Sequence, residues 1–177
     1  LPCNLLAATR VVDSPTALAI DGRGWFLVVD TRTDEEFFTR QGNFAVDENG
    51  YLSTLEGCVL RGVDGFNPTE IRNVRIDSTG MPATSDPRAT VTSFRVEYSG
   101  ELVVVLSDGT EFVRARVLLQ DFRVPANLQR VLPHLYKGTS EAEPIGSPQP
   151  PGVNGLGWLR TRVVELEDVR WTVKGSY

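Results

Sequence analysis

The side chains that most often carry out chemistry are scarce in this sequence. Histidine occurs once, as His134 in a Leu-Pro-His-Leu context. Nucleophilic catalysis needs a base next to the nucleophile, and the sequence has no G-x-S-x-G elbow to present a catalytic serine. Structural histidines are commoner than activated ones, so we expect His134 to be structural and the chain to have no catalytic residue.

Acidic residues cluster in two places that could resemble an acid–base pair or a metal site. Asp34, Glu35 and Glu36 are consecutive in a polar stretch, and adjacent carboxylates in a loop are usually solvated charges. The segment Asp47-Glu48-Asn49-Gly50 hints at a calcium loop, but the first ligand would fall on Ala45 and the closing Glu is absent. Neither cluster predicts a metal or a cofactor.

The two cysteines, Cys3 and Cys58, lie far apart and have only His134 as a companion. This spacing is not that of a zinc site. The pair is a candidate disulfide, and a free buried cysteine is the alternative. The glycine-rich stretches 22–24 and 152–157 do not stand between a strand and a helix, as phosphate-binding loops do. They predict turns and close backbone contacts.

The composition is that of an ordinary globular protein of one domain. The chain has 177 residues, 41% hydrophobic and 23% charged, which is enough to bury a core without staples. Its net charge is −5, with 23 Asp and Glu against 18 scattered Lys and Arg. We therefore expect no nucleic-acid partner. No apolar run is long enough to span a bilayer, so we expect no membrane insertion.

Most of the sequence predicts an all-β fold, because short apolar stretches bounded by Gly, Pro, Asn and Asp recur about every ten residues. We expect a sandwich or partly open barrel of hairpins. The expected strands are Ala17–Ile20, Trp25–Asp30, Glu36–Thr39, Phe44–Val46, Leu52–Ser53, Val59–Gly62, Arg75–Asp77, Ser93–Tyr98, Leu102–Leu106, Glu111–Leu119 and Leu159–Val164.

Three turns connect these strands with residues that suit hairpins. The segments Asp47–Gly50 and Ser107–Thr110 each combine an Asp with a Gly, and both residue types favour tight turns. Tyr98–Glu101 is the third turn. It joins two apolar runs into a three-stranded meander over Ser93–Leu119, a unit large enough to be stable.

Two segments depart from the strand pattern. Asp121–Tyr136 predicts one short helix, because Pro125 suits a first turn and Leu128, Val131 and Leu132 share a face. Gly138–Gly157 is rich in Pro, Gly and Ser, and we expect an extended loop there.

The run LAIDGRGWFLVVD, followed by FFTRQGNFAVDENGYLSTLEGCVLRG, resembles the flagellar hook and rod protein family. That family carries LAI-x-G-x-G-F-F, then Y/F-T-R-x-G-x-F-x-x-D-x-x-G-Y-L and a later Gly. A second block, LLQDFRVPANLQRVLPHLY, resembles the family less closely. The motif residues are Leu18, Ala19, Ile20, Gly22, Gly24, Trp25 (usually Phe), Phe26, Phe38, Thr39, Arg40, Gly42, Phe44, Asp47, Gly50, Tyr51, Leu52, Gly62, Phe122 and Pro125.

The motif is interpreted as scaffold. Asp47 and Gly50 fold a hairpin across which Phe44 and Tyr51 can face each other. Glycines such as Gly42 let backbones approach closely, and Thr39-Arg40 supplies polar pairing. The generic alternative is a hairpin of any β-sandwich.

The resemblance implies a structural subunit that packs in the helical tube of the flagellar basal-body rod or hook and supports torque transmission. Neither end of the chain shows the heptads through which family members polymerise, so residues 1–177 are expected to form one distal-rod-like middle domain, flanked by segments 1–12 and 170–177. We expect a monomer or weak oligomer, partnered in the full-length protein by other rod or hook subunits.

The resemblance also implies a location in the basal body, in the periplasm or cell exterior, and export without a cleaved signal peptide. Enzymatic activity and cofactors are not expected. The alternative from another class is a secreted β-sandwich that binds carbohydrate or protein through exposed Trp25, Trp158 or Trp171. A small hydrolase is the third and least favoured class.

Overall fold

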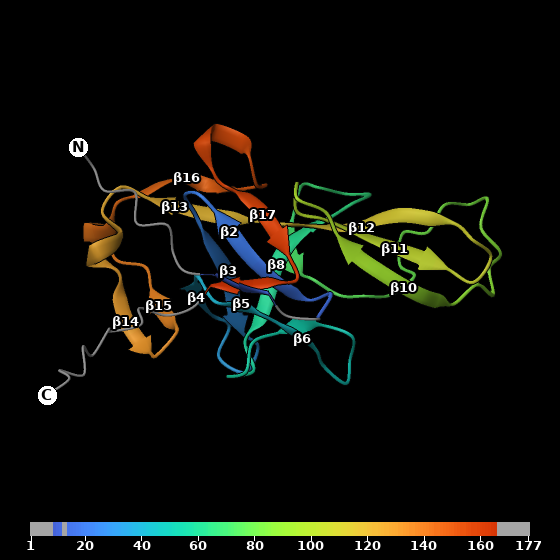
Figure 1. The fold of residues 1–177 in the computed structure, drawn as a ribbon, viewed down its shortest axis with the longest axis horizontal. Helices are drawn as coiled ribbons and strands as arrows, with labels where there is room; N and C mark the ends of the chain where they lie inside the picture. Colours follow the sequence, from blue (N-terminus) through green and yellow to red (C-terminus); the bar gives the residue numbers. More distant parts are fainter. Residues whose placement is uncertain (1–8, 12–13, 166–177) are drawn as a thin grey trace, which may run out of the picture.

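The protein consists of paired β-strands joined by short turns and 3-10 helices (Figure 1). A computed structural model describes residues 9–11 and 14–165 of the chain. The all-β prediction is confirmed, and the sheets do not close into a barrel.

The main sheet contains a path of strands in the order β10-β11-β12-β8-β3-β4-β15-β14. These strands are β3 (Trp25–Asp30), β4 (Glu35–Thr39), β8 (Val59–Asp64), β10 (Val91–Val96), β11 (Glu101–Leu106), β12 (Glu111–Val117), β14 (Gln129–Leu132) and β15 (Leu135–Lys137). The named neighbours pair in antiparallel register.

Five further strands attach to this path. They are β6 (Ala45–Val46), β7 (Leu52–Ser53), β9 (Ile71–Asn73), β13 (Leu119–Phe122) and β16 (Pro144–Gln149). β7 and β9 pair with β8, β6 pairs with β7, and β13 lies between β3 and β16. The strand β9 was not among the strands expected from sequence; its residues are largely exposed, so it lacks an alternating apolar pattern.

Two small sheets complete the fold. One has the order β17-β2-β5, with β2 (Ala17–Asp21), β5 (Gly42–Asn43) and β17 (Trp158–Thr161). The other pairs β1 (Thr9–Val11) with β18 (Val163–Glu165). Strands from the two ends of the described chain thus pair with each other, β1 with β18 and β2 with β17.

All three expected hairpin turns are present. Ala45 pairs with Ser53 across the turn at 47–50. In the meander β10-β11-β12, the amides of Gly100 and Gly109 donate to the carbonyls of Glu97 and Leu106, both at 2.9 Å. The two glycines have φ of +85°, a conformation that costs other residues free energy.

The expected helix over 121–136 is wrong beyond a single turn. The 3-10 helix η1 covers only Pro125–Asn127, with Pro125 in its first turn as expected. The next residues, Gln129–Leu132, form β14, whose side chains are all exposed. Leu128, Val131 and Leu132 do not form the buried face of a helix, because Val131 and Leu132 are exposed to solvent.

The segment 138–157 is more ordered than the extended loop expected from its composition. It contains 3-10 helices η2 (Ser140–Ala142) and η3 (Val153–Gly155), with β16 between them. β16 contains Pro144 and Pro148 and pairs only with β13, and proline is tolerated in such an edge strand. Pairing with a partner strand therefore overrides the loop-like composition.

The main core lies where β2, β3, β7, β8 and β13 meet. Leu18, Phe26, Leu52, Leu60 and Leu119 are fully buried there. Burial stabilises each such side chain by about 1.5–3 kcal/mol. The meander has only a small cluster of its own, in which Ala89, Val104 and Leu106 are buried.

The molecule is elongated (Figure 1). The meander β10-β11-β12 lies at one end of the long axis, and the hairpin β14-β15 lies at the other. The main core occupies the middle, so the meander is joined to it chiefly through β8 and β12.

Candidate functional site

The first part of the glycine-rich motif forms the turn between β2 and β3. Gly22 and Gly24 both have φ of +120°, which an L side chain rarely adopts. The guanidinium of Arg40 fixes this turn by donating to the carbonyls of Ile20 at 3.0 Å, Gly22 at 2.9 Å and Gly24 at 2.6 Å. Arg40 therefore acts as a clasp, because one side chain satisfies three turn carbonyls.

Gly42 and Gly62 permit close contact between backbones. A Cβ on Gly42 would lie 1.9 Å from the carbonyl oxygen of Leu18, and one on Gly62 would lie 2.3 Å from that of Arg116. Real Cβ atoms do not approach backbone this closely, so both strand pairings need glycine.

The Asp47 carboxylate organises the turn between β6 and β7. It accepts hydrogen bonds from the amides of Asn49 at 2.8 Å and Tyr51 at 2.9 Å, and from the Ser53 hydroxyl at 3.1 Å. Burial raises the pKa of Asp47, but these hydrogen bonds together outweigh it and hold the pKa below its ordinary value. The ionised carboxylate is a structural part of this turn.

The motif aromatics pack in edge-to-face pairs within the scaffold. Phe26 meets Phe44 with ring centroids 5.3 Å apart, and Phe38 meets Phe122 at 4.9 Å. Such pairs add about 0.5–1.5 kcal/mol beyond the area they bury.

The expected contact of Phe44 with Tyr51 across the hairpin is not found. Phe44 precedes β6 and turns into the core, whereas Tyr51 forms a bridge with Arg75. The Arg75 guanidinium carbon lies 5.3 Å from the centre of the Tyr51 ring, a cation–π distance.

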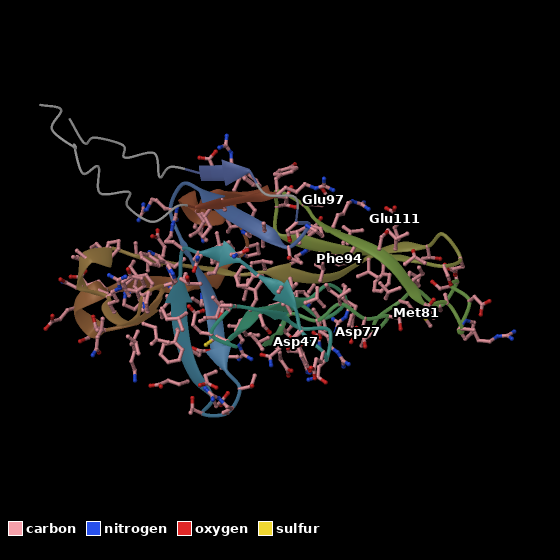
Figure 2. The ribbon with its side chains drawn as sticks, turned by 60° about the horizontal axis from the view of Figure 1, so that its bottom comes forward. Asp47, Asp77, Met81, Phe94, Glu97 and Glu111 are labelled. Atoms are coloured by element: carbon pink, nitrogen blue, oxygen red, sulfur yellow. The ribbon has the colours of Figure 1, made fainter. Side chains whose placement is uncertain are left out.

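A buried ionic clamp, which the sequence analysis did not predict, joins the meander to the body. Arg114 of β12 is 6% exposed; its Nη1 contacts Asp64 Oδ1 and its Nε contacts Asp77 Oδ1, both at 2.5 Å. Burial raises the pKa of Asp77, but the Arg114 hydrogen bond and the Thr79 amide hold it below its ordinary value. Asp77 lies between the body and the meander (Figure 2).

A β-bulge explains how an arginine comes to point inward. Leu102 pairs with Ala115 and Val103 pairs with Val113, so Arg114 is the extra residue of β12. Bulges re-aim side chains in this way. Two consecutive residues, Arg114 and Ala115, are buried as a result. The only sequence signal was a charged residue inside an apolar strand.

Thr39 and Arg40 act within the scaffold and line neither of two open hollows of the surface. Thr39 is 1% exposed and accepts a hydrogen bond from the Gln41 amide at 3.0 Å. One open hollow of about 500 Å³ lies over β8 and β9 beside Tyr51, and another of about 530 Å³ lies beside Glu35 and Lys137. Neither hollow is lined by Thr39 or Arg40.

The remaining candidate residues occupy ordinary structural places. His134 is half-buried in the β14–β15 turn. Glu35 pairs with Lys137. Cys58 carries a buried free thiol whose pKa is raised by burial. Cys3 lies outside the described residues, so the candidate disulfide stays a prediction.

The tryptophans differ in exposure. Trp25 is half-buried against Tyr136, at a centroid distance of 5.2 Å. Trp158 is 48% exposed and lies beside Tyr98. Trp171 lies outside the described residues.

Residues 9–11 and 14–165 offer neither a metal-binding cluster nor a membrane-spanning helix. No group of three or more His, Cys, Asp or Glu side chains in this part of the chain could hold a metal ion. No helix in it has the length and apolar character needed to cross a membrane.

Comparison with known proteins gives a family match that covers the glycine-rich motif. Residues 19–104 match the family model described as "Flagellar hook protein FlgE/F/G D1 domain". The matched range runs from β2 through the body and ends within β11 of the meander.

Curated relatives point the same way. The chain is 28% identical over 172 residues to the flagellar basal-body rod protein FlgG of Bacillus subtilis, covering 94% of this chain and 56% of that protein. It is 32% identical over 94 residues to the flagellar hook protein FlgE of Rhizobium meliloti, covering 48% and 23%. A hook protein FlgE of Helicobacter mustelae is 42% identical over 55 residues, covering 31% and 12%. The chain spans about half the length of the rod proteins it matches.

Proposed function

The chain belongs to the flagellar hook and rod protein family, and from that premise we propose that it is a structural subunit of the bacterial flagellar rod or hook. In this role it packs in a helical tube beside other rod or hook subunits and supports torque transmission. Its described residues act as one β-rich middle domain of such a subunit.

The observation that supports the proposal is that residues of the family motif hold neighbouring backbone segments together. Arg40 fastens three carbonyls of the β2–β3 turn, and Gly42 lets β5 lie against Leu18 without a side chain between them. These contacts stiffen backbone, and a stiff backbone is what a load-bearing subunit requires. Rod membership is favoured over hook membership, because the similarity to rod proteins extends over most of this chain.

Location and chemistry follow from the same proposal. The subunit resides in the flagellar basal body, at the periplasm or cell exterior, and is exported without a cleaved signal peptide. It performs no catalysis and binds no cofactor. The isolated chain is a monomer or a weak oligomer. The carbohydrate-binding alternative gains no support from the relatives, whose names are those of rod and hook proteins.

The test is to find the protein in the organelle. An affinity-tagged copy, made in the bacterium that encodes it, should co-purify with intact hook–basal bodies, and deletion of its gene should abolish swimming. A tagged cytosolic protein expressed at the same level is the control for carry-over. Absence from purified basal bodies together with normal swimming of the deletion strain would overturn the proposal. Sequencing the mature N-terminus tests the mode of export.

A further inference from the structure

The sequence contains two Asn-Gly pairs, and the structure places them in unlike surroundings. Asn49-Gly50 belongs to the turn between β6 and β7, and Asn154-Gly155 lies in η3. Asparagine followed by glycine is prone to deamidation, because glycine has no side chain to obstruct attack by its own backbone nitrogen. The attack requires rotation of the peptide group between the two residues, which brings this nitrogen up to the asparagine side chain.

The peptide group between Asn49 and Gly50 is held at both of its polar atoms. The Asn49 carbonyl accepts a hydrogen bond from Arg75 Nε at 2.8 Å, and the Gly50 amide donates to the Asp47 carbonyl at 3.0 Å. The flanking groups are held as well, because the Asn49 amide donates to the Asp47 carboxylate and the Gly50 carbonyl accepts from the Ile76 amide, both at 2.8 Å. Rotation of this peptide group would therefore break several hydrogen bonds.

The peptide group between Asn154 and Gly155 is much less restrained. Both residues are exposed, and within the described part of the chain no hydrogen bond joins their backbone to a residue outside 152–156. Asn154 has φ of +52° and ψ of +36°, a region that L residues adopt at a cost. A Cβ on Gly155 would meet nothing within 4 Å. Rotation here is opposed neither by distant hydrogen bonds nor by packed neighbours.

We propose that Asn154 is a site of spontaneous deamidation in the folded protein and that the fold protects Asn49. The backbone nitrogen of Gly155 attacks Cγ of Asn154, and the new C–N bond closes a succinimide ring. The bond from Cγ to Nδ2 breaks, and this nitrogen leaves as ammonia with the proton of the Gly155 N–H. The reaction needs no enzyme, and it does not depend on the proposed function.

Water is the co-reactant that opens the ring. Its hydroxyl adds to one of the two ring carbonyl carbons, the C–N bond at that carbon breaks, and the ring nitrogen takes the remaining proton. Opening at Cγ gives aspartate, whereas opening at the backbone carbonyl carbon gives isoaspartate. Both products add a negative charge, and isoaspartate also lengthens the main chain by one methylene group.

The residues that follow η3 leave little room for a longer main chain. Leu156 is 7% exposed and forms a bridge with Arg23 in the β2–β3 turn. The Gly157 amide donates to the Arg23 carbonyl at 2.8 Å. Isoaspartate at position 154 should therefore loosen the contact between this segment and the β2–β3 turn, whereas aspartate changes only the charge of an exposed side chain.

A time course on the full chain tests the site. The purified protein is incubated at mildly alkaline pH, and peptide mapping by mass spectrometry follows Asn, Asp and isoaspartate at positions 49 and 154. In the folded protein, position 154 should react about tenfold faster or more, because at least two hydrogen bonds must break before position 49 can react. Equal rates, or a faster reaction at position 49, would overturn the proposal.

The same time course in guanidinium chloride separates structure from local sequence. Both pairs are Asn-Gly, so the unfolded chain should deamidate at similar rates at the two positions. If position 154 keeps its full advantage in the unfolded chain, the structure is not the cause and the proposed protection is wrong. N154Q is the control for assignment, because it keeps a neutral amide and should remove the product at position 154 while leaving position 49 unchanged.

Removal of one protecting hydrogen bond tests the explanation at the other pair. R75A deletes the donor to the Asn49 carbonyl, so deamidation at position 49 should accelerate about threefold or more with no change at position 154. R72A is the matched control, because Arg72 pairs with Asp64 and Glu70 and does not contact this turn. Equal rates at position 49 in R75A and R72A would show that the Arg75 hydrogen bond gives no protection.

Hydrogen exchange tests the effect of the product. Aged protein enriched in isoaspartate at position 154 should exchange the Gly157 amide faster than fresh protein does, because its bond to the Arg23 carbonyl is weakened. N154D carries the same added charge without the extra methylene group and should exchange this amide as the wild type does. Equal exchange in the aged protein and N154D would refute the effect of main-chain lengthening.

Discussion

In the body of the molecule, strands are held by close backbone approach and a large apolar core, whereas the meander joins this core at its base and is held there by buried paired charges as well. Gly42 allows β5 to approach β2 in a way that a Cβ would block, and Leu18, Phe26 and Leu60 are fully buried in the same part of the molecule. The meander contributes Val96, Leu102, Ala115 and Val117 to the main core and has a separate, smaller apolar cluster. Its attachment uses Arg114, which is held between Asp64 and Asp77.

The two arrangements suit different mechanical tasks. Backbone contacts through glycine leave no room for adjustment, so the body is stiff. A buried ion pair is weak evidence for net stability, but removal of one partner is costly because it leaves an uncompensated charge. The clamp therefore ties the meander to the body through Arg114, the bulged residue of β12.

Loss of the clamp should have the largest effect. Arg114→Ala removes the buried cation between Asp64 and Asp77 and leaves them only the partly exposed Arg72 and Arg75, each 3.5 Å away, so we expect about 3 kcal/mol lower free energy of unfolding. Urea denaturation measures this value. Arg95→Ala is the matched control on β10, because Arg95 pairs with Glu97 and Glu111 at an exposed site and should cost at most about 1 kcal/mol. Equal losses would show that the clamp has no special role.

A side chain introduced at a closely packed glycine of the body should have the second-largest effect on stability. Gly42→Ala places a methyl 1.9 Å from the Leu18 carbonyl oxygen, and we expect a loss of about 3 kcal/mol as β2 and β5 separate. Gly57→Ala is the control: its φ of +86° is strained, but its Cβ would meet nothing within 4 Å, so about 1 kcal/mol is expected. Thermal unfolding measures both losses. If Gly57→Ala proves more destabilising than Gly42→Ala, the close backbone approach at Gly42 is disproved.

Removal of the clasp at the β2–β3 turn should have a moderate effect. Arg40→Ala leaves the carbonyls of Ile20, Gly22 and Gly24 without this donor, and we expect a loss of about 2 kcal/mol. Hydrogen exchange should rise in the turn and stay unchanged in the meander. Arg32→Ala, at an 82% exposed side chain paired with Asp30, should be nearly neutral. Faster exchange throughout the molecule would contradict a local role.

Acidification should weaken the clamp between the meander and the body, and we expect this effect to be the smallest of the four. Asp77 has a folded pKa below its ordinary value, so its contribution is present above about pH 3.9 and is lost as the pH falls through the folded pKa. Asp77→Asn should be less stable at pH 7 but lose less between about pH 4 and pH 2 than the wild type. Parallel curves for the two proteins over that range would rule out Asp77 as a source of acid sensitivity.

The strand framework could be predicted because it depends on local chemistry. Asp47 and Gly50 specify their turn through side-chain hydrogen bonds and positive φ. Apolar runs bounded by turn residues predicted β2, β3 and the meander for the same reason. The helix over 121–136 was wrong because Leu128 and Val131 share a helical spacing by coincidence, and pairing with β15 determined the outcome.

What the sequence determined by itself is the three hairpin turns, the apolar strands β2, β3 and those of the meander, and certain residues whose types the surrounding backbone requires. Glycine at position 42 and aspartate at position 47 are examples, because each acts on nearby backbone. Only the tertiary structure decided which charged side chains form ion pairs. Arg114 lies 37 residues from Asp77 and 50 from Asp64, and a one-residue bulge turns it inward. Such contacts depend on strand register, which no local pattern in this sequence encodes.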